Sequence, residues 1–302
     1  MSETKQFDVI IIGGSYAGLS AAMSLGRSLR KTLVIDSGKP CNIQTPHSHN
    51  FLTQDGSSPS EISTLAKNQV REYETIKFYN GKAVSAQNTD FGFEITTENG
   101  EKFNSKKLII ATGIIDEIPD IKGFKESWGI SLVHCPYCHG YEYKGKKTGI
   151  IATGDKAIHI SSLVKNLTQD VTILTQEKSK FTDEQLEKLK NNHIEIIETE
   201  ITELKHTNGF VNSLMFDNGK EINFEAVYGA FPFHQHSDIP EKLGCELTDF
   251  GHIKTDQFQK TNVAGLFVCG DNSSMMRSIS NAVMTGNVAG AMVNMELVTD
   301  CF

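Results

Sequence analysis

The sequence lacks long apolar runs, an excess of positive charge and a dense set of cysteines. No uninterrupted apolar stretch approaches the ~20 residues that a membrane-spanning helix needs, so no span of a membrane is expected. The formal net charge is −8, which argues against nucleic acid or an anionic membrane surface as the main partner. Six cysteines spread over 302 residues do not make a disulfide framework.

The polar N-terminus is expected to lead directly into a strand at Phe7 rather than to form a signal peptide. Together with the cysteine usage, this makes the cytoplasm the expected compartment. The length allows two domains of ordinary size, and the composition, with 38% hydrophobic and 22% charged residues, is that of a globular protein.

A C-x-x-C pair stands in the middle of the chain at Cys135 and Cys138, with His134 before it and His139 after it. Two cysteines at this spacing can close a small disulfide, and a nearby histidine or helix start favours the thiolate. A redox active site is therefore the first hypothesis. A zinc knuckle is the second, because all four side chains are possible ligands. Structural zinc sites usually draw a second ligand pair from elsewhere, and the sequence has no second C-x-x-C and no H-x3-H.

The first part of the chain has the pattern of a dinucleotide-binding βαβ unit. A strand from Phe7 to Ile12 is followed by the turn GGSYAG at residues 13–18, and then by a helix over residues 19–29. A second strand over residues 31–35 ends at Asp36. In such a unit the glycines let the backbone approach a pyrophosphate, the helix N-terminus favours its charge, and the acid accepts a ribose hydroxyl.

One position departs from this pattern, because Ser15 replaces the middle glycine of G-x-G-x-x-G and Gly14 stands one place earlier. The alternative interpretation is an ordinary βαβ unit whose glycines only pack the helix. Residues 40–55 are expected to form a loop, whose His47 and His49 either line the ligand or lie in solvent.

A polar helix is expected over residues 60–74. Beyond it, residues 91–97, an Asn-Gly turn and residues 107–111 predict a hairpin and a buried strand. The sequence Ala-Thr-Gly at residues 111–113 closes that strand. This end would lie beside the dinucleotide, because open α/β sheets bind their ligands at the carboxyl ends of the strands.

The same order of elements occurs again after a Pro/Gly-rich linker at residues 118–123. The expected elements are a strand over 148–151, a turn over 152–157, a helix over 158–167, a strand over 171–174, and an Asn-Gly hairpin with a closing strand over 210–228. Two nucleotide-fold domains, the second inserted after the first, account for this repeat better than one large sheet.

The second copy is weaker where a nucleotide would bind. Its first and last glycine positions are Ala152 and Ala157, and only Gly154 remains. Asp155 at the helix start would repel a pyrophosphate, and no arginine cluster follows the second strand to hold a 2′-phosphate. The second site is therefore either weakened for a nicotinamide nucleotide or is not one.

The C-terminal region is expected to form one further strand and one further helix. Residues 262–269 predict an apolar strand that ends at Gly270-Asp271, and residues 280–297 predict a helix rich in small residues and methionine. Asp271 would stand where sugar or ribityl hydroxyls can be held, and the small residues would let the helix pack on a flat ligand. The alternative is a core strand and a core helix.

These patterns predict an α/β fold of two Rossmann-like, three-layer nucleotide-binding domains, the second inserted into the first. The expected boundaries are residues 1–115 and 241–302 for the discontinuous first domain. The inserted domain, over residues 116–240, carries the C-x-x-C pair.

Together these residues resemble the low-molecular-weight thioredoxin reductase family of flavoproteins, over nearly the whole chain. Four landmarks occur in order: GGSYAG with its downstream acid, Ala-Thr-Gly at 111–113, the C-x-x-C pair, and Gly270-Asp271 before the last helix. The resemblance implies FAD in the discontinuous domain and a homodimer. It also implies an inserted pyridine-nucleotide domain that carries the cysteines and rotates against the FAD domain.

The resemblance also implies roles for individual residues. Cys138 would lie against the flavin, and Cys135 would exchange with an external dithiol or disulfide. His139, or less readily His134, would be the acid–base group that keeps one sulfur ionised. The residues expected at the FAD site are Gly13, Gly14, Ser15, Ala17, Gly18, Asp36, Ser37, His49, Asn50, Ala111, Thr112, Gly113, Gly270, Asp271, Ser280, Asn281 and Ala282.

Two departures from the family pattern bear on function. His139 replaces the family's acid after the second cysteine, and the NADPH-binding glycines and arginines are largely missing. The sequence CPYCHGYE at residues 135–142 is more similar to a subgroup that includes fungal and bacterial dithiol oxidases. Those enzymes close disulfides in small natural products such as gliotoxin and holomycin.

The main hypothesis is thus an FAD-dependent dithiol–disulfide oxidoreductase with weak or absent use of NADPH. Its partner would be a small dithiol or disulfide or a thioredoxin-like protein, and oxygen or ferredoxin are candidates for the electron partner. The first alternative is an NADPH-dependent thioredoxin reductase. The second is a redox-sensing flavoprotein with little turnover.

Overall fold

The computed structural model describes residues 5–302, and their contacts divide the chain into two compact units. The first unit runs up to Ile43 and includes Pro59–Ile115 and His234–Phe302. The second consists of Gln44–Ser58 and Asp116–Phe233. The short segment Gln44–Ser58, which the sequence patterns assign to the first domain, thus has its contacts within the second.

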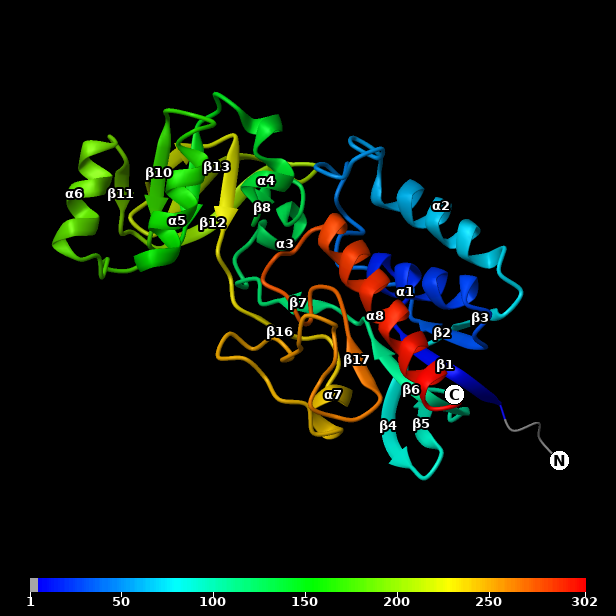
Figure 1. The fold of residues 1–302 in the computed structure, drawn as a ribbon. Coiled ribbons are helices and arrows are strands. Elements are labelled where there is room, and N and C mark those ends of the chain that lie inside the picture. The colour runs from blue at the N-terminus through cyan, green and yellow to red at the C-terminus, as the bar shows by residue number, and fades with distance from the viewer. Residues whose placement is uncertain (1–4) are drawn as a thin grey trace. The chain divides into compact units, whose positions relative to one another are not determined.

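The first unit is built on a seven-stranded sheet in the order β3-β2-β1-β6-β5-β4, with β17 paired to β6 (Figure 1). β1, β2, β3, β6 and β17 pair in parallel, whereas β4, β5 and β6 form an antiparallel meander. The elements are β1 (Gln6–Ile12), α1 (Tyr16–Arg27), β2 (Thr32–Asp36), α2 (Pro59–Arg71), β3 (Ile76–Asn80), β4 (Ala83–Thr89), β5 (Gly92–Thr97), β6 (Lys102–Ile110), α7 (Ile239–Lys242), β17 (Leu266–Val268) and α8 (Ile279–Thr299).

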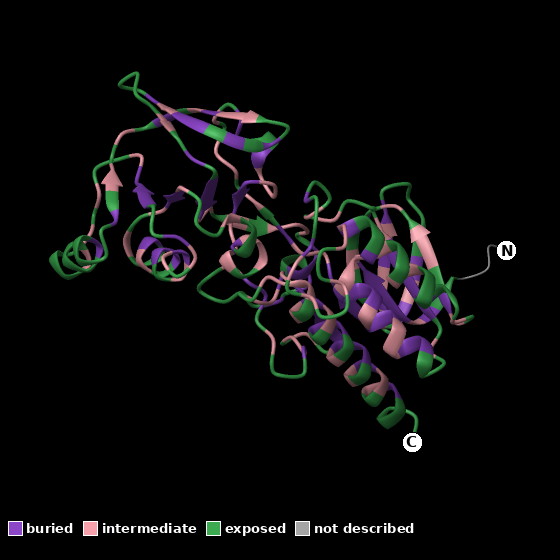
Figure 2. Cartoon of the chain, turned by 90° about the horizontal axis from the view of Figure 1, so that it is seen from above, coloured by how far each residue is buried: buried purple, intermediate pink, exposed green. Residues whose placement is uncertain are grey.

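The core of the first unit follows from the alternation of side chains along β1. Val9 and Ile11 point to the face that α1 and α8 cover, and Ile10 and Ile12 point to the opposite face. All four are buried, as expected for a strand in the middle of a parallel sheet. Figure 2 shows these central strands as buried and the outer sides of the helices as exposed.

The small residues of α8 serve helix packing. A Cβ atom at Gly286 would meet the backbone of Ala17 in α1, and one at Gly290 would meet Ala21. The hydroxyl of Ser20 in α1 also donates to the carbonyl of Val283 in α8 at 2.6 Å. Gly286 and Gly290 thus bring the helix against α1, as the alternative of a core helix predicted, and the packing of its small residues on a flat ligand stays a prediction.

The second unit has a five-stranded parallel sheet in the order β11-β10-β9-β15-β8 and a three-stranded antiparallel sheet in the order β12-β13-β14. Its elements are α3 (Phe124–Ser127), β8 (Leu132–Val133), α4 (Pro136–His139), the 3₁₀ helix η1 (Tyr141–Tyr143), β9 (Thr148–Ile151), α5 (Gly154–Val164), β10 (Val171–Leu174), α6 (Asp183–Asn191), β11 (Glu195–Ile197), β12 (Ile201–Thr207), β13 (Phe210–Phe216), β14 (Glu221–Asn223) and β15 (Ala226–Gly229). The short strands β7 (Ile114–Asp116) and β16 (Phe233–Gln235) pair with each other.

Three layers make up the second unit, because its parallel sheet buries both faces. Ile150 and Ile173 pack with residues of α5 and α6 on one face. Ile151 and Leu174 pack with residues of β12 and β13 on the other. The predicted class, an α/β fold with two Rossmann-like sheets and the second inserted, is confirmed.

Several predicted element boundaries are wrong. Residues 152–157 are not a turn before a later helix, because α5 already begins at Gly154. The strand expected over 262–269 is confined to Leu266–Val268. The expected closing strand over 221–228 is broken into β14 and β15, which belong to different sheets. Among the described residues, no helix is long and apolar enough to cross a membrane.

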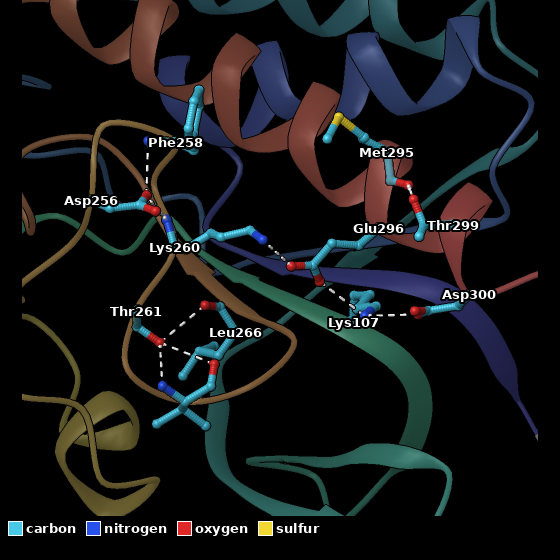
Figure 3. Close-up of polar contacts among 11 residues, drawn as sticks. Lys107, Asp256, Phe258, Lys260, Thr261, Leu266, Met295, Glu296, Thr299 and Asp300 are labelled. Carbon is cyan, nitrogen blue, oxygen red and sulfur yellow. Dashed lines mark hydrogen bonds and ion pairs between the residues drawn. The ribbon is translucent and has the colours of Figure 1, made fainter.

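An ion network ties the end of α8 to the sheet of the first unit (Figure 3). Lys107 of β6 lies 2.9 Å from Glu296 and 3.0 Å from Asp300, and its side chain is only 13% exposed. Lys260 contacts the other oxygen of Glu296. Burial opposes the charge of Lys107, but the two carboxylates outweigh it and raise the pKa of this lysine. The C-terminal helix is therefore anchored by charge as well as by packing.

Replacing Lys107 with methionine is expected to lower the free energy of unfolding by about 1–3 kcal/mol, because it removes a cation from the partly buried Glu296. The neighbouring variant Lys106→Met is the control. Lys106 is more exposed and pairs with Asp8 at 3.4 Å, and such pairs contribute about 0–1 kcal/mol. Denaturant unfolding followed by circular dichroism measures the free energy of unfolding of both variants. Equal decreases would show that the network around Glu296 contributes no more to stability than an exposed ion pair.

Candidate active site

The two cysteines of the C-x-x-C pair form a disulfide at the start of α4, with their Cα atoms 5.3 Å apart. Cys135 caps the helix in an extended conformation, and Pro136 takes the first helical position, where no backbone donor is needed. The backbone N–H of Cys138 donates to the sulfur of Cys135 at 3.2 Å. This donor would also stabilise a thiolate on Cys135 once the disulfide is reduced.

His139 ends α4 and is the predicted acid–base group of the pair. Burial lowers its pKa, the carboxylate of Glu142 opposes that effect, and His49 adds to it. With the pKa below its usual 6.5, the imidazole is neutral at pH 7 and can accept a proton. His134, on the other side of the cysteines, lies with its ring centroid 5.9 Å from that of Trp128.

His49 and Asn50 were predicted at the FAD site, but both lie in the segment that groups with the second unit. His49 has Asp55 at 3.6 Å and Glu142 at 3.5 Å. Asn50 has a left-handed backbone, and its N–H donates to Asp55 at 2.7 Å. Sequence reasoning did not single out Glu142. Its position three residues after His139 was the available signal.

The glycine turn after β1 is shaped for close backbone approach. A Cβ at Gly13 would run into the carbonyl of Ala111, and one at Gly18 would run into the carbonyl of Gly13. Ser15 is the N-cap of α1, and its hydroxyl makes no capping hydrogen bond in the described chain. The N–H groups of Ala17 and Gly18, in the first turn of this 12-residue helix, thus have no cap from Ser15 and can bind an anion.

Asp36 stands at the end of β2, beside this turn. It accepts a hydrogen bond from the N–H of Gly14 at 3.2 Å and pairs with Lys67 of α2 at 3.2 Å. The acid is thus held at the edge of the glycine turn, where a ribose of a dinucleotide would reach it. The exposed Ser37 follows it. Lys67 was not predicted, because a lysine in a polar helix carries no local signal of its partner.

The other predicted FAD residues lie just after β6, just after β17 and in the first turn of α8. The N–H of Gly270 donates to the hydroxyl of Thr285 in α8 at 3.1 Å, and Asp271 lies 3.8 Å from Arg277. The hydroxyl of Thr112 and the side-chain amide nitrogen of Asn281 are buried and have no hydrogen-bond partner among residues 5–302. The predicted residues of this group are Ala111, Thr112, Gly113, Gly270, Asp271, Ser280, Asn281 and Ala282, whereas Thr285 and Arg277 were not predicted.

Such unsatisfied buried donors are rare in proteins unless a ligand or water pairs with them. The buried polar atoms of Thr112 and Asn281, the glycine turn at residues 13–18 and Asp36 at its edge together fit a flavin dinucleotide. The residues of the first unit are thus suited to hold FAD.

The corresponding turn of the second unit is different. Asp155 lies in the first turn of α5, and Gln185 of α6 donates to its carboxylate at 2.7 Å. A fixed negative charge therefore stands where the helix N-terminus would otherwise attract a phosphate. The second unit also contains no arginine, since all four arginines of the sequence lie in the first unit.

Within residues 5–302, no group of three or more His, Cys, Asp or Glu side chains is arranged to hold a metal ion. The disulfide also occupies both sulfurs of the C-x-x-C pair. The geometry of the pair thus favours redox chemistry over the zinc alternative.

Comparisons with known proteins agree with this geometry. The model of the pyridine nucleotide-disulphide oxidoreductase family matches residues 7–286. The chain is 33% identical to the thioredoxin reductase tcpT of Claviceps purpurea, covering 99% of this chain and 97% of that protein. It is 30% identical to the thioredoxin reductase sirT of Leptosphaeria maculans, covering 96% and 94%.

Solved structures extend these similarities. An oxidoreductase from Agrobacterium tumefaciens superposes with a TM-score of 0.91 at 35% identity, covering 97% of this chain and 99% of that one. The structure of HlmI superposes with a TM-score of 0.92 at 27% identity, covering 99% and 95%.

In the reduced protein, we expect Cys135 to be alkylated faster than Cys138 near neutral pH, because the N–H of Cys138 stabilises the Cys135 thiolate. Iodoacetamide labelling for short times, followed by mass spectrometry of the peptides, measures the two rates. The exposed Cys301 serves as an internal control for an ordinary surface thiol. Faster labelling of Cys138 would contradict the assignment.

Proposed function

We propose a function from the premise that the chain belongs to the pyridine nucleotide-disulphide oxidoreductase family, as a thioredoxin reductase-like FAD-dependent oxidoreductase. The proposed activity is oxidation of a small dithiol to its disulfide through Cys135 and Cys138, with weak or absent use of NADPH. Oxygen is the proposed final electron acceptor, as in the dithiol oxidases whose CPYCHGYE sequence this chain resembles.

The observation that carries this proposal is the contrast between the two helix N-termini. α1 presents a glycine turn and an unobstructed first turn, whereas α5 presents Asp155 fixed by Gln185. A carboxylate at that position disfavours a pyrophosphate. The absence of arginine from the second unit also removes the usual partner of a 2′-phosphate.

The proposed exchange needs only the disulfide and one base. A thiolate of the substrate attacks the sulfur of Cys135, the Cys135–Cys138 bond breaks, and Cys138 leaves as a thiolate. The second substrate thiolate then attacks the substrate sulfur of the mixed disulfide and releases Cys135. The substrate loses two electrons and two protons, and the cysteine pair gains them. His139, neutral at pH 7, can accept a substrate proton and pass it to Cys138.

FAD, when bound, supplies the two-electron acceptor that returns the cysteine pair to the disulfide. We propose that the glycine turn at residues 13–18 and the N-terminus of α1 hold its pyrophosphate, and that Asp36 holds a ribose. Thr112 and Asn281 offer the buried polar atoms that a flavin would satisfy. A homodimer remains a proposal that rests on the family resemblance.

An NADPH-dependent thioredoxin reductase is the competing function, supported by the retained β9-α5-β10 arrangement and by the names of the relatives. In that case a thioredoxin-like protein would be the partner, and ferredoxin is a further candidate as electron donor. A redox-sensing flavoprotein with little turnover is the third possibility, and the redox disulfide with a neutral histidine beside it favours turnover instead.

Aerobic incubation with dithiothreitol tests the proposed oxidation. We expect one hydrogen peroxide to form for each disulfide made, because the dithiol gives two electrons and two protons to oxygen. Cys135→Ser and Cys138→Ser should each abolish this activity, whereas Cys301→Ser, near the exposed C-terminus, should leave it unchanged. Oxygen consumption that persists in both active-site variants would contradict the proposal.

A further inference from the structure

Lys67 contacts the acid at the end of β2 from a helix that lies outside the glycine-turn motif. One carboxylate oxygen of Asp36, Oδ1, accepts a hydrogen bond from the N–H of Gly14 at 3.2 Å. The other oxygen, Oδ2, accepts a hydrogen bond from the ammonium of Lys67 in α2, also at 3.2 Å. Both side chains are partly buried, with 17% of Asp36 and 24% of Lys67 exposed. Each oxygen of the carboxylate is thus held by a different element.

The main chain around Asp36 is fixed as well. The carbonyl of Asp36 accepts a hydrogen bond from the N–H of Gly81 at 2.9 Å. A Cβ atom at Gly14 would come within 2.8 Å of Cβ and Cγ of Asp36, so this close approach requires glycine. Because the main chain is fixed here, the direction in which the carboxylate points depends on its two hydrogen bonds.

α2 holds Lys67 in place from the other side. Ala66 and Val70 of this helix pack against the core cluster that includes residues of α1. At the start of the helix, the hydroxyl of Tyr16 in α1 donates to the carbonyl of Pro59 at 3.4 Å. Figure 1 shows the two helices next to each other in the first unit. Lys67 is therefore presented by a helix that is anchored to α1, the helix that follows the glycine turn.

The carboxylate of Asp36 keeps capacity for a ligand in this arrangement. An ionised carboxylate offers about four acceptor positions, two on each oxygen. Gly14 and Lys67 use one on each oxygen, which leaves one on each oxygen for the hydroxyls of a ribose. The ammonium of Lys67 also offsets the repulsion between the carboxylate and the phosphates of a bound dinucleotide. Without it, the carboxylate could rotate about its Cβ–Cγ bond and its charge would be unbalanced.

We propose that Lys67 is a positioning residue of the dinucleotide site, which holds the Asp36 carboxylate in the orientation that accepts ribose hydroxyls at the adenosine end. Lys67 thereby extends the site from the βαβ unit to α2, a helix that the glycine motif does not include. This role rests on the proposed binding of FAD by the first unit, and it needs no direct contact between Lys67 and the ligand.

The test compares FAD with its analogue that carries 2′-deoxyadenosine, each bound to the flavin-free protein of full length. Isothermal titration calorimetry measures the two dissociation constants. In the unmodified chain we expect the analogue to bind about 10-fold or more weakly than FAD, because a hydrogen bond to a charged acceptor is lost. In Lys67→Met we expect this ratio to fall to about 3-fold or less, because the carboxylate no longer points at the hydroxyl.

Three further variants serve as references. Lys67→Arg should keep the ratio of the unmodified chain, because a guanidinium also donates to a carboxylate. Asp36→Ala should lower the ratio as Lys67→Met does, because the acceptor itself is removed. Lys77→Met removes an exposed lysine from the neighbouring strand β3 and should leave both dissociation constants unchanged.

The ratio separates a positioning role from a structural one. If Lys67→Met weakens FAD and its analogue by the same factor, the ratio is unchanged, the lysine only stabilises α2, and the proposal is overturned. A ratio near 1 in the unmodified chain would also overturn it, because the ribose would then not lie at Asp36. Failure of the unmodified flavin-free chain to bind FAD would instead contradict the proposed function.

Discussion

Phosphate binding at a helix N-terminus depends on the charge of the side chains in the first helical turn. Backbone N–H groups there attract a phosphate unless a side chain already supplies negative charge. α1 leaves its first turn unobstructed after the glycines at residues 13–18. α5 has a similar place in its own sheet but carries Asp155 in its first turn, paired to Gln185. One fold is thus used twice, and only its first copy has a helix N-terminus without an acidic side chain in the first turn.

The difference between the N-termini of α1 and α5 bears on the direction in which the cysteine pair would pass electrons. A disulfide on a four-residue helix, with the N–H of Cys138 donating to the sulfur of Cys135 and a neutral His139 next in sequence, is suited to thiol–disulfide exchange in either direction. Under the proposed function, with FAD in the first unit and weak NADPH binding in the second, electrons from an external dithiol have a suitable first acceptor.

Local patterns predicted the parts of the site that are contiguous in sequence. The turn at residues 13–18, the acid at Asp36 and the C-x-x-C pair were each visible because spacing along the chain fixes their geometry. The contacts of Asp36 with Lys67 and of Asp155 with Gln185 were not, because each joins side chains on separate elements. The start of α5 was missed for a related reason. In the sequence, Gly154 indicates a turn, but in the structure the helix already begins there, shortly after β9.

Anaerobic stopped-flow reduction of the oxidised holoenzyme tests the central claim most directly. The flavin absorbance is followed after mixing with NADPH in one experiment and with dithiothreitol in the other. The impaired N-terminus of α5 predicts slow or undetectable bleaching by NADPH and rapid bleaching by the dithiol. Bleaching by NADPH at a rate equal to or above that of the dithiol would contradict it, because the second unit would then be a working nicotinamide site.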